Sequence, residues 1–302
     1  MNRRHWRIVV VLLSLACMVW LLISQWSKIR DLDLDVRPGM MILALVALIL
    51  LFFLDAYGWH LIMRSLGHAP EPRTSIRIWM VSSLTRYLPG GIWGYLSRAA
   101  MCTEHGVPLV ATSLGLYLET VLLMASALAA GFPALLSATG SPIDQGTAAM
   151  LWMVLALFIH PKVLAWTRHL PGMPGRLLAV APFPKQVHML GLFLYYLVFW
   201  AAFGGVFLCF VLALHPLAPA SWLPVGASIS MSFLIGFIAV FIPGGIGVRE
   251  SAMYLLLLPH MPPAACLLIS ITSRLWIMAG EAISVGVAVT LVTRQPRDQP
   301  GT

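Results

Sequence analysis

Long apolar runs, separated by short polar stretches, divide this chain into candidate membrane crossings. Seven runs are long enough to cross the hydrocarbon core of a bilayer, and three further runs are apolar but shorter. The long runs are 8–25, 40–62, 108–130, 147–166, 188–214, 223–241 and 264–292, and the shorter runs are 76–88, 93–105 and 247–259. The pattern predicts an all-α polytopic membrane protein with about seven or eight transmembrane helices.

Lysine and arginine gather in alternate loops between these runs. They occur at 3–7, 64–98, 162–185 and 294–297 on one predicted side, and at 28–37 on the other. Because cytoplasmic loops carry the excess of positive charge, the first four segments are predicted to be cytoplasmic. Both chain termini are then cytoplasmic as well.

Two termini on the same side require an even number of crossings. Either segment 247–259 completes a return with the Pro262-Pro263 turn, or another segment is re-entrant. The same choice decides whether the two halves of the chain are parallel or inverted repeats. The sequence leaves both alternatives open.

The string Pro-Gly-Gly-Ile occurs twice, at 89–92 and 243–246, about half of the chain length apart. Proline removes a backbone donor and glycine allows a sharp redirection, so each string should interrupt a helix. In a bilayer such breaks survive only against protein or a wet cavity, and paired breaks indicate a carrier's binding site. We expect broken or re-entrant segments meeting at one hydrated pocket, within half-repeats 40–166 and 188–292. The break residues are Pro89, Gly90, Gly91, Pro243, Gly244, Gly245 and Gly247.

An arginine follows each break. After the first, a helix should begin near Ile92 or Trp93, and its free amides together with Arg98 would suit a phosphate. After the second, Arg249 and Glu250 fall in the first turn of the next helix. The helix dipole disfavours a cation there, so Arg249 needs Glu250, another carboxylate or a bound headgroup as partner. Glu250 also stabilises a helix end without any ligand.

Three further charges lie inside long runs, where they are costly and are functional candidates. Glu119 would contact a headgroup amine, act as a proton-coupled switch or, as a neutral group, fix helix packing. Arg274 and Glu281 are two helical turns apart, too far for a direct pair. We predict that Arg274 pairs with Glu250 or Glu119, and that Glu281 pairs with either arginine that follows a break. The predicted headgroup-binding residues are Arg98, Glu119, Arg249, Glu250, Arg274 and Glu281.

Composition limits the classes of function. Sixty per cent of the residues are hydrophobic and 10% are charged, with a mean hydropathy of +0.88, as in integral membrane proteins. The net charge of +8 comes from basic residues that gather in the loops between the apolar runs. This placement is typical of a membrane protein, so nucleic-acid binding is not expected. The nine histidines and four cysteines show no metal-ligand or disulfide spacing, and neither a metal nor a cofactor is predicted. No polar stretch exceeds a loop, so residues 1–302 are predicted to form a single membrane domain.

The string Phe-Ile-Pro-Gly-Gly-Ile-Gly-Val-Arg-Glu at 241–250 resembles the transmembrane, flippase-like region of lysylphosphatidylglycerol synthases and their stand-alone relatives. Three further segments support the resemblance, and together they extend it over nearly the whole length. They are 86–91 with Arg98, 117–120 with Glu119, and 273–275 with Arg274. The resemblance implies a bacterial-type inner-membrane protein that moves an anionic or aminoacylated lipid headgroup between leaflets. Relatives that synthesise the lipid carry a further soluble transferase domain, so the resemblance does not extend to aminoacyl transfer.

Three functions remain open. The first choice is a lipid translocator that is not an enzyme. Without a Walker-type string, it would work by downhill exchange or by a proton gradient acting through Glu119. The second is a membrane transferase with a polyprenyl-phosphate donor, although the expected aspartate-rich cluster is missing. The third is a scaffold whose arginine-rich loops, 64–105 and 161–187, dock a separate soluble lipid-modifying enzyme. Membrane lipids are the expected partners in each case.

Overall fold

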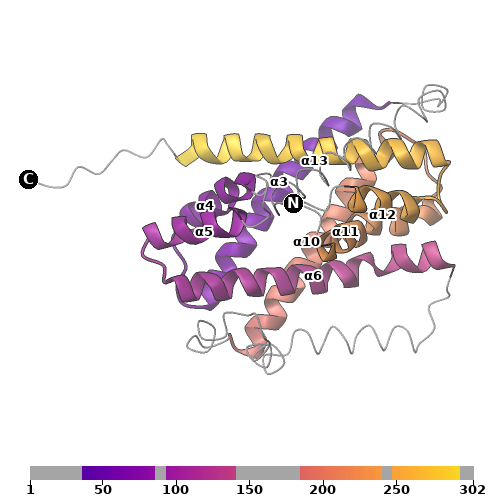
Figure 1. The fold of residues 1–302 in the computed structure, drawn as a ribbon. Coiled ribbons are helices and arrows are strands. Elements are labelled where there is room, and N and C mark those ends of the chain that lie inside the picture. The colour runs from indigo at the N-terminus through magenta and orange to yellow at the C-terminus, as the bar shows by residue number, and fades with distance from the viewer. Residues whose placement is uncertain (1–35, 86–92, 141–183, 240–246, 293–302) are drawn as a thin grey trace, which may run out of the picture.

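The computed structural model describes residues 36–85, 93–140, 184–239 and 247–292, and all regular elements within these ranges are helices (Figure 1). Five of them are long and apolar enough to cross a membrane. The elements are α3 (Pro38–Ser65), α4 (Pro72–Leu84), α5 (Trp93–Glu104), α6 (Leu109–Thr139), α10 (Gln186–Leu212), η3 (Pro219–Ser221), α11 (Trp222–Ile238), α12 (Val248–Leu257) and α13 (Pro263–Val292). The predicted all-α membrane class is therefore confirmed.

The predicted apolar runs correspond closely to these helices. The five long runs that fall in the described ranges are α3, α6, α10, α11 and α13, and the three shorter runs are α4, α5 and α12. The remaining two long runs, 8–25 and 147–166, lie outside the described residues. Helices α3 and α4 begin two and four residues earlier than predicted, at Pro38 and Pro72, because proline fits the first helical turn, where no intrahelical amide bond is needed.

The helices run between two ends of the molecule. We call the end where α3 finishes and α6 begins the Arg64 end, and the opposite end, where α12 leads into α13, the His260 end. The Arg37 amide, just before α3, donates to the Ala213 carbonyl, just after α10, over 2.9 Å. The start of α3 and the finish of α10 therefore share the His260 end, and these two helices are antiparallel (Figure 1).

Two pairs of consecutive helices form hairpins that enter from opposite ends. Helices α4 and α5 both meet the Arg64 end, since short loops join them to α3 and α6. Helices α11 and α12 both meet the His260 end, where η3 precedes α11 and α13 follows α12 (Figure 1). With 13, 12 and 10 residues, α4, α5 and α12 extend about 15–20 Å, roughly half of a bilayer core. Helix α12 returns toward the end where α11 begins, and α4 with α5 enters and leaves at the opposite end, so both arrangements considered from the sequence occur among the described helices.

The order of helix lengths occurs twice along the chain. Helices α3, α4, α5 and α6 have 28, 13, 12 and 31 residues, and α10, α11, α12 and α13 have 27, 17, 10 and 30. Each hairpin also packs on the last helix of the other set, α4 on α13 and α11 on α6. Because the hairpins open at opposite ends, this order is that of an inverted repeat. The proposed half-repeats 40–166 and 188–292 include undescribed residues and stay a prediction.

His260 joins three elements at the end named after it. One ring nitrogen lies 2.9 Å from the Ser137 hydroxyl of α6, and the other lies 3.1 Å from the Ser221 hydroxyl of η3. Burial lowers the pKa of His260, so near pH 7 the neutral ring accepts one hydrogen bond and donates the other. This contact fixes the open end of the α11–α12 hairpin against α6.

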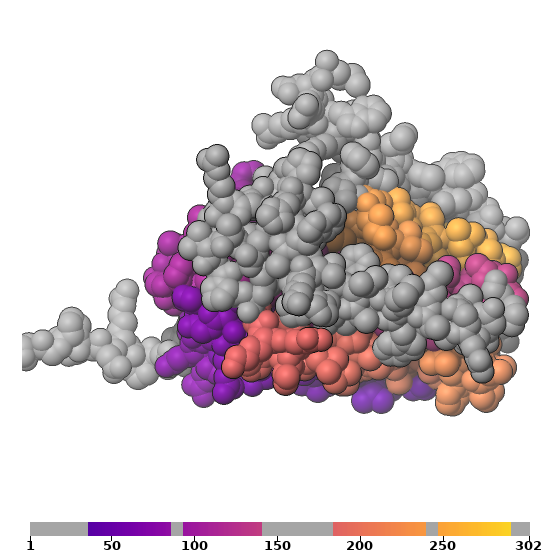
Figure 2. All heavy atoms as spheres, turned by 90° about the horizontal axis from the view of Figure 1, so that it is seen from below, coloured from indigo at the N-terminus to yellow at the C-terminus, as the bar shows by residue number. Residues whose placement is uncertain are grey.

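The outer faces of α3 and α10 are apolar, as lipid contact requires. These two helices lie side by side on the face shown in Figure 2. Exposed apolar side chains recur every three or four residues, so they form one stripe on each helix. The stripe residues are Ile42, Leu43, Val46 and Leu50 on α3, and Val187, Leu190, Leu194 and Val198 on α10. Such a stripe would be unfavourable in water but suits hydrocarbon.

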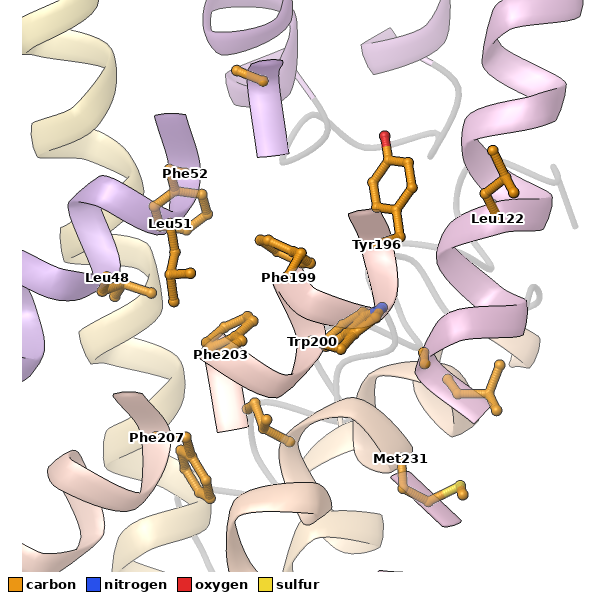
Figure 3. Packing of buried hydrophobic residues seen from close by; sticks show 14 of the residues in the cluster. Leu48, Leu51, Phe52, Leu122, Tyr196, Phe199, Trp200, Phe203, Phe207 and Met231 are labelled. Carbon is orange, nitrogen blue, oxygen red and sulfur yellow. The ribbon is translucent and has the colours of Figure 1, made fainter. Parts of the chain in front are cut away.

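Aromatic residues of α10 fill the centre between the two sets of helices (Figure 3). Phe199, Trp200 and Phe203 pack on one another with ring centroids 5.4–5.9 Å apart. On the adjoining side, α6 and α11 approach so closely that a Cβ on Gly131 would lie 2.7 Å from the backbone nitrogen of Met231. Small residues allow this approach in membrane proteins, where packing replaces the hydrophobic effect as the force between helices.

Gly131→Ala is expected to lower the free energy of unfolding by about 1–3 kcal/mol, because the added methyl group overlaps the α11 backbone. Gly191→Ala is the matched control, since none of the described residues lies within 4 Å of a Cβ at that helical position. Thermal unfolding in detergent micelles measures both variants. Equal midpoints for the two variants would contradict the proposed close contact between α6 and α11.

Candidate functional site

A buried ion pair ties the first hairpin to the long helix that follows it. The Arg98 Nη1 atom of α5 lies 2.5 Å from the Glu119 Oε2 atom of α6, and both side chains are about nine-tenths buried. Glu119 lies about one third of the way along α6 and is buried there, so the pair lies within the bundle. Two charges at this depth are tolerated only because each compensates the other.

Helix α4 supplies two further hydrogen bonds to this pair. The Trp79 indole donates to Glu119 Oε1 over 2.7 Å, and the Arg98 Nε atom donates to the Ser82 hydroxyl over 3.0 Å. Trp79 and Ser82 are three residues apart, so they lie on the same face of the short helix. The guanidinium carbon of Arg98 also lies 4.9 Å from the Trp59 ring centroid and 5.4 Å from that of Trp79. Three helices besides α5 therefore position Arg98.

A second ion pair ties the second hairpin to α13. The Arg274 Nη1 atom lies 2.7 Å from Glu250 Oε1, and both side chains are largely buried. The other oxygen, Glu250 Oε2, accepts the Gly247 amide over 2.6 Å, which caps the start of α12 from the third position of the helix. Gly247 has a φ of 87°, a conformation that only glycine adopts readily. Glu250 thus makes the helix-end contact that was one of its two readings from the sequence, and its headgroup role stays a prediction.

Arg249 lies in the first turn of α12, as predicted. Its Cβ atom packs against Gly236 of α11, where a methyl group would come within 2.9 Å. Its guanidinium carbon lies 4.8 Å from the ring centroid of Phe233, also on α11. Arg249 therefore holds the two arms of the second hairpin together through a cation–π contact.

The two pairs have opposite polarity. In the first hairpin the short helix supplies the arginine and the long helix supplies the carboxylate, whereas in the second the short helix supplies the carboxylate. The structure thus joins Arg98 with Glu119, and Glu250 with Arg274, as two separate pairs. Of the partners predicted for Arg274, Glu250 is the one found. The Arg98–Glu119 pair was not among the predicted combinations.

For the other predicted site residues, the described part of the chain tests only some of the predictions. Glu281 is buried on α13, and its predicted pairing stays a prediction. Gly247 is the N-cap of α12. The other break residues lie in 86–92 and 240–246, outside the described residues, so the predicted pocket between the breaks stays a prediction too. In this conformation Arg98 and Arg274 each contact a carboxylate of the chain itself. No group of three or more potential metal-ligating side chains occurs within the described ranges.

Three contributors to the first site were not singled out from the sequence: Trp59, Trp79 and Ser82. Trp79 and Ser82 share a face of a short run that contains several hydroxyl side chains, and this polarity was the available signal. Trp59 gave no signal, since tryptophan near the end of an apolar run is typical of an interfacial residue.

The comparisons with known proteins give one match. The family model for the lysylphosphatidylglycerol synthase TM region matches residues 7–279. Neither the curated proteins nor the solved structures include a significant match. The family match covers both hairpins, both ion pairs and the five apolar helices through most of α13. The chain therefore belongs to the lysylphosphatidylglycerol synthase transmembrane region family and is a multi-pass membrane protein related to lipid handling.

Proposed function

We propose that this protein is a lipid translocator that moves an anionic or aminoacylated headgroup across the bacterial cytoplasmic membrane. One observation carries the proposal. Two hairpins, each with at least one arm too short to cross a bilayer, enter from opposite ends, and a buried arginine–carboxylate pair holds each against the following long helix. Discontinuous helices in inverted repeats are the common construction of carriers with a binding site near the midplane.

The two ion pairs would act as gates to opposite ends. Release of the Arg98–Glu119 pair frees the hairpin that opens at the Arg64 end, and release of the Glu250–Arg274 pair frees the hairpin at the His260 end. With both pairs closed, the conformation described here corresponds to an occluded state. A headgroup that binds one open state more tightly shifts the population toward that state, as alternating access requires.

The proposed substrate has a charged headgroup and ordinary acyl tails. Guanidinium groups recognise phosphate oxygens, and the carboxylates would receive an amine where the headgroup carries one. The apolar stripes of α3 and α10 suit the tails, which remain in the bilayer during transfer. This mechanism breaks no covalent bond, so the protein would not be an enzyme. The Arg64 end would face the cytoplasm with both termini, where a separate soluble lipid-modifying enzyme would supply the lipid.

Leaflet-resolved lipid transfer in proteoliposomes tests the proposal. Fluorescent phosphatidylglycerol and its aminoacylated form are placed in one leaflet, and a membrane-impermeant quencher reports their redistribution. Protein-dependent redistribution is the expected result. Formation of a new lipid product would instead indicate the transferase, and neither redistribution nor product would indicate the scaffold.

Arg249→Ala is expected to abolish this transfer while membrane insertion stays intact, because it removes a cation of the site and the contact with Phe233. Arg77→Ala, on the polar part of α4, is a control for the loss of one positive charge. Transfer by both variants is compared at equal amounts of reconstituted protein. Transfer at the rate of the unmodified protein would remove Arg249 from the site.

A further inference from the structure

The first ion-pair site contains two buried donors that have no acceptor among the described residues. Trp59 and Tyr196 are completely buried, yet within those residues neither the Trp59 indole N–H nor the Tyr196 hydroxyl has a hydrogen-bond partner. Buried polar groups in proteins are almost always paired, because an unpaired one loses its hydration without compensation. Two unpaired donors close together therefore require a particular explanation.

Trp59 contacts Arg98, and Tyr196 packs beside Gly58, the neighbour of Trp59 in α3. The Trp59 ring lies under the Arg98 guanidinium, 4.9 Å from its central carbon. The Tyr196 hydroxyl lies against the preceding residue of α3, since a Cβ on Gly58 would be 2.8 Å from it. Figure 3 shows this hydroxyl pointing away from the aromatic cluster of α10. The two unpaired donors thus lie on the same side of the bundle as the first ion pair.

The Glu119 carboxylate accepts two hydrogen bonds from this set of donors. Its two oxygens receive Arg98 Nη1 and Trp79 Nε1, at 2.5 and 2.7 Å. An arginine with neighbouring N–H and O–H donors is the arrangement that proteins use for phosphate oxygens. A carboxylate has two oxygens, whereas a phosphate group has more, so Glu119 satisfies only part of the donor set.

We propose that Glu119 occupies the phosphate subsite of the lipid headgroup, as an internal anion that the substrate phosphate displaces. The inference rests on the proposed function and assigns a location to its substrate chemistry. On displacement, Arg98 and Trp79 turn from the carboxylate to the phosphate, and Trp59 and Tyr196 donate to its remaining oxygens. The substrate class is then a lipid with a phosphate group within reach of α3, α5 and α10.

The second ion pair differs from the first because its carboxylate also holds a backbone amide. Glu250 also accepts the Gly247 amide, and this backbone hydrogen bond caps α12. Displacement of Glu250 would therefore uncap a helix, whereas Glu119 is held by side chains that can turn to another anion. This difference assigns the exchangeable anion to the first site and a structural role to the second carboxylate.

An internal anion lowers the apparent affinity for an external one, because only molecules with Glu119 displaced can bind. Glu119→Gln removes this competition and keeps an acceptor for Trp79. We expect the variant to bind dihexanoyl phosphatidylglycerol at least about tenfold more tightly than the unmodified protein. The free variant should also melt at a lower temperature, with a larger rise on adding the lipid, because Arg98 is then without its counter-charge.

Isothermal titration calorimetry of the full chain in detergent measures this affinity. The matched control is Glu104→Gln, which makes the same charge change on an exposed position of the same hairpin and should bind as the unmodified protein does. A second titration with inorganic phosphate separates the two sources of the ligand. Tighter binding of the lipid supports the proposal, and tighter binding of inorganic phosphate alone overturns the lipid assignment. Unchanged affinity for both probes overturns the internal-anion role of Glu119.

Tyr196→Phe distinguishes a binding role from a structural one. Its hydroxyl has no partner among the described residues, so removal should raise the melting temperature, and yet it should weaken lipid binding about three- to tenfold, the equivalent of one hydrogen bond. Tyr195→Phe is the control, because that hydroxyl donates to the Leu54 carbonyl and its removal should affect stability without affecting binding. Lipid affinity unaffected by Tyr196→Phe would exclude this hydroxyl from the subsite.

These binding results are independent of transfer. If Glu119→Gln gains affinity but the unmodified protein moves no lipid in proteoliposomes, the phosphate subsite stands and the translocator function is rejected. If lipid moves but Glu119→Gln gains no affinity, the function stands and the internal anion is rejected.

Discussion

Arg98→Ala is expected to lower the free energy of unfolding by about 3–5 kcal/mol and to abolish lipid transfer. Among the described residues, the substitution leaves the buried Glu119 carboxylate with the Trp79 indole as its hydrogen-bond donor, and an uncompensated charge at this depth is strongly destabilising. Thermal unfolding in micelles and leaflet-resolved transfer measure the two effects on the same preparation.

A double substitution separates the structural loss from the functional one. Arg98→Met with Glu119→Met replaces both charges by side chains of similar length, and such replacements are often neutral or stabilising. We expect the double variant to recover most of the stability lost in Arg98→Ala and to remain inactive in transfer. A double variant that is both stable and active would show that the pair serves packing alone.

Arg274→Glu is expected to be the most damaging single change at the second pair, with a loss of about 3–5 kcal/mol in the free energy of unfolding. It places two carboxylates together where Glu250 now contacts an arginine at 2.7 Å. The reversed pair, Arg274→Glu with Glu250→Arg, should recover the electrostatic part of this loss. It should remain about 1 kcal/mol less stable than the unmodified protein, because the arginine side chain introduced on α12 cannot accept the Gly247 amide.

The reversed pair is measured by unfolding in micelles beside the two single variants. A double variant no more stable than Arg274→Glu alone would reject the ion pair as a stabilising contact. Complete recovery would instead reject the capping role of Glu250, since the two roles make different demands on the same side chain. Arg274→Met is a useful reference, because it removes the arginine and leaves the carboxylate on its helix cap.

The helices of this protein were largely predictable. A segment that crosses a bilayer must satisfy every backbone group internally and must be apolar over about 20 residues, so length and composition mark it directly. Each long run that falls in the described ranges is a helix there, and the three shorter runs supply three of the four hairpin arms, α11 being the fourth. The capping role of Glu250 was predictable for a similar reason, because it depends on neighbours within one helical turn.

Partners across helices were only partly predictable. Arg274 with Glu250 was one of two proposed pairs, and the structure selected it. Arg98 with Glu119 was not proposed, because a single charge in an apolar helix indicates that it needs a partner and not which one. Trp79 and Ser82 of α4 hold Glu119 and Arg98 in position for this pairing. Their residue types alone did not indicate a contact with buried charges.

The sequence by itself determined the membrane class, the positions of the helices and the family, since these depend on local apolar length and on one specific string. Only the tertiary structure decided that the hairpins enter from opposite ends and that the two ion pairs have opposite polarity. The physical reason is that depth and direction within a bilayer are set by packing between helices. Gly131 against Met231 and the Arg37 amide on the Ala213 carbonyl are contacts between residues far apart in the chain.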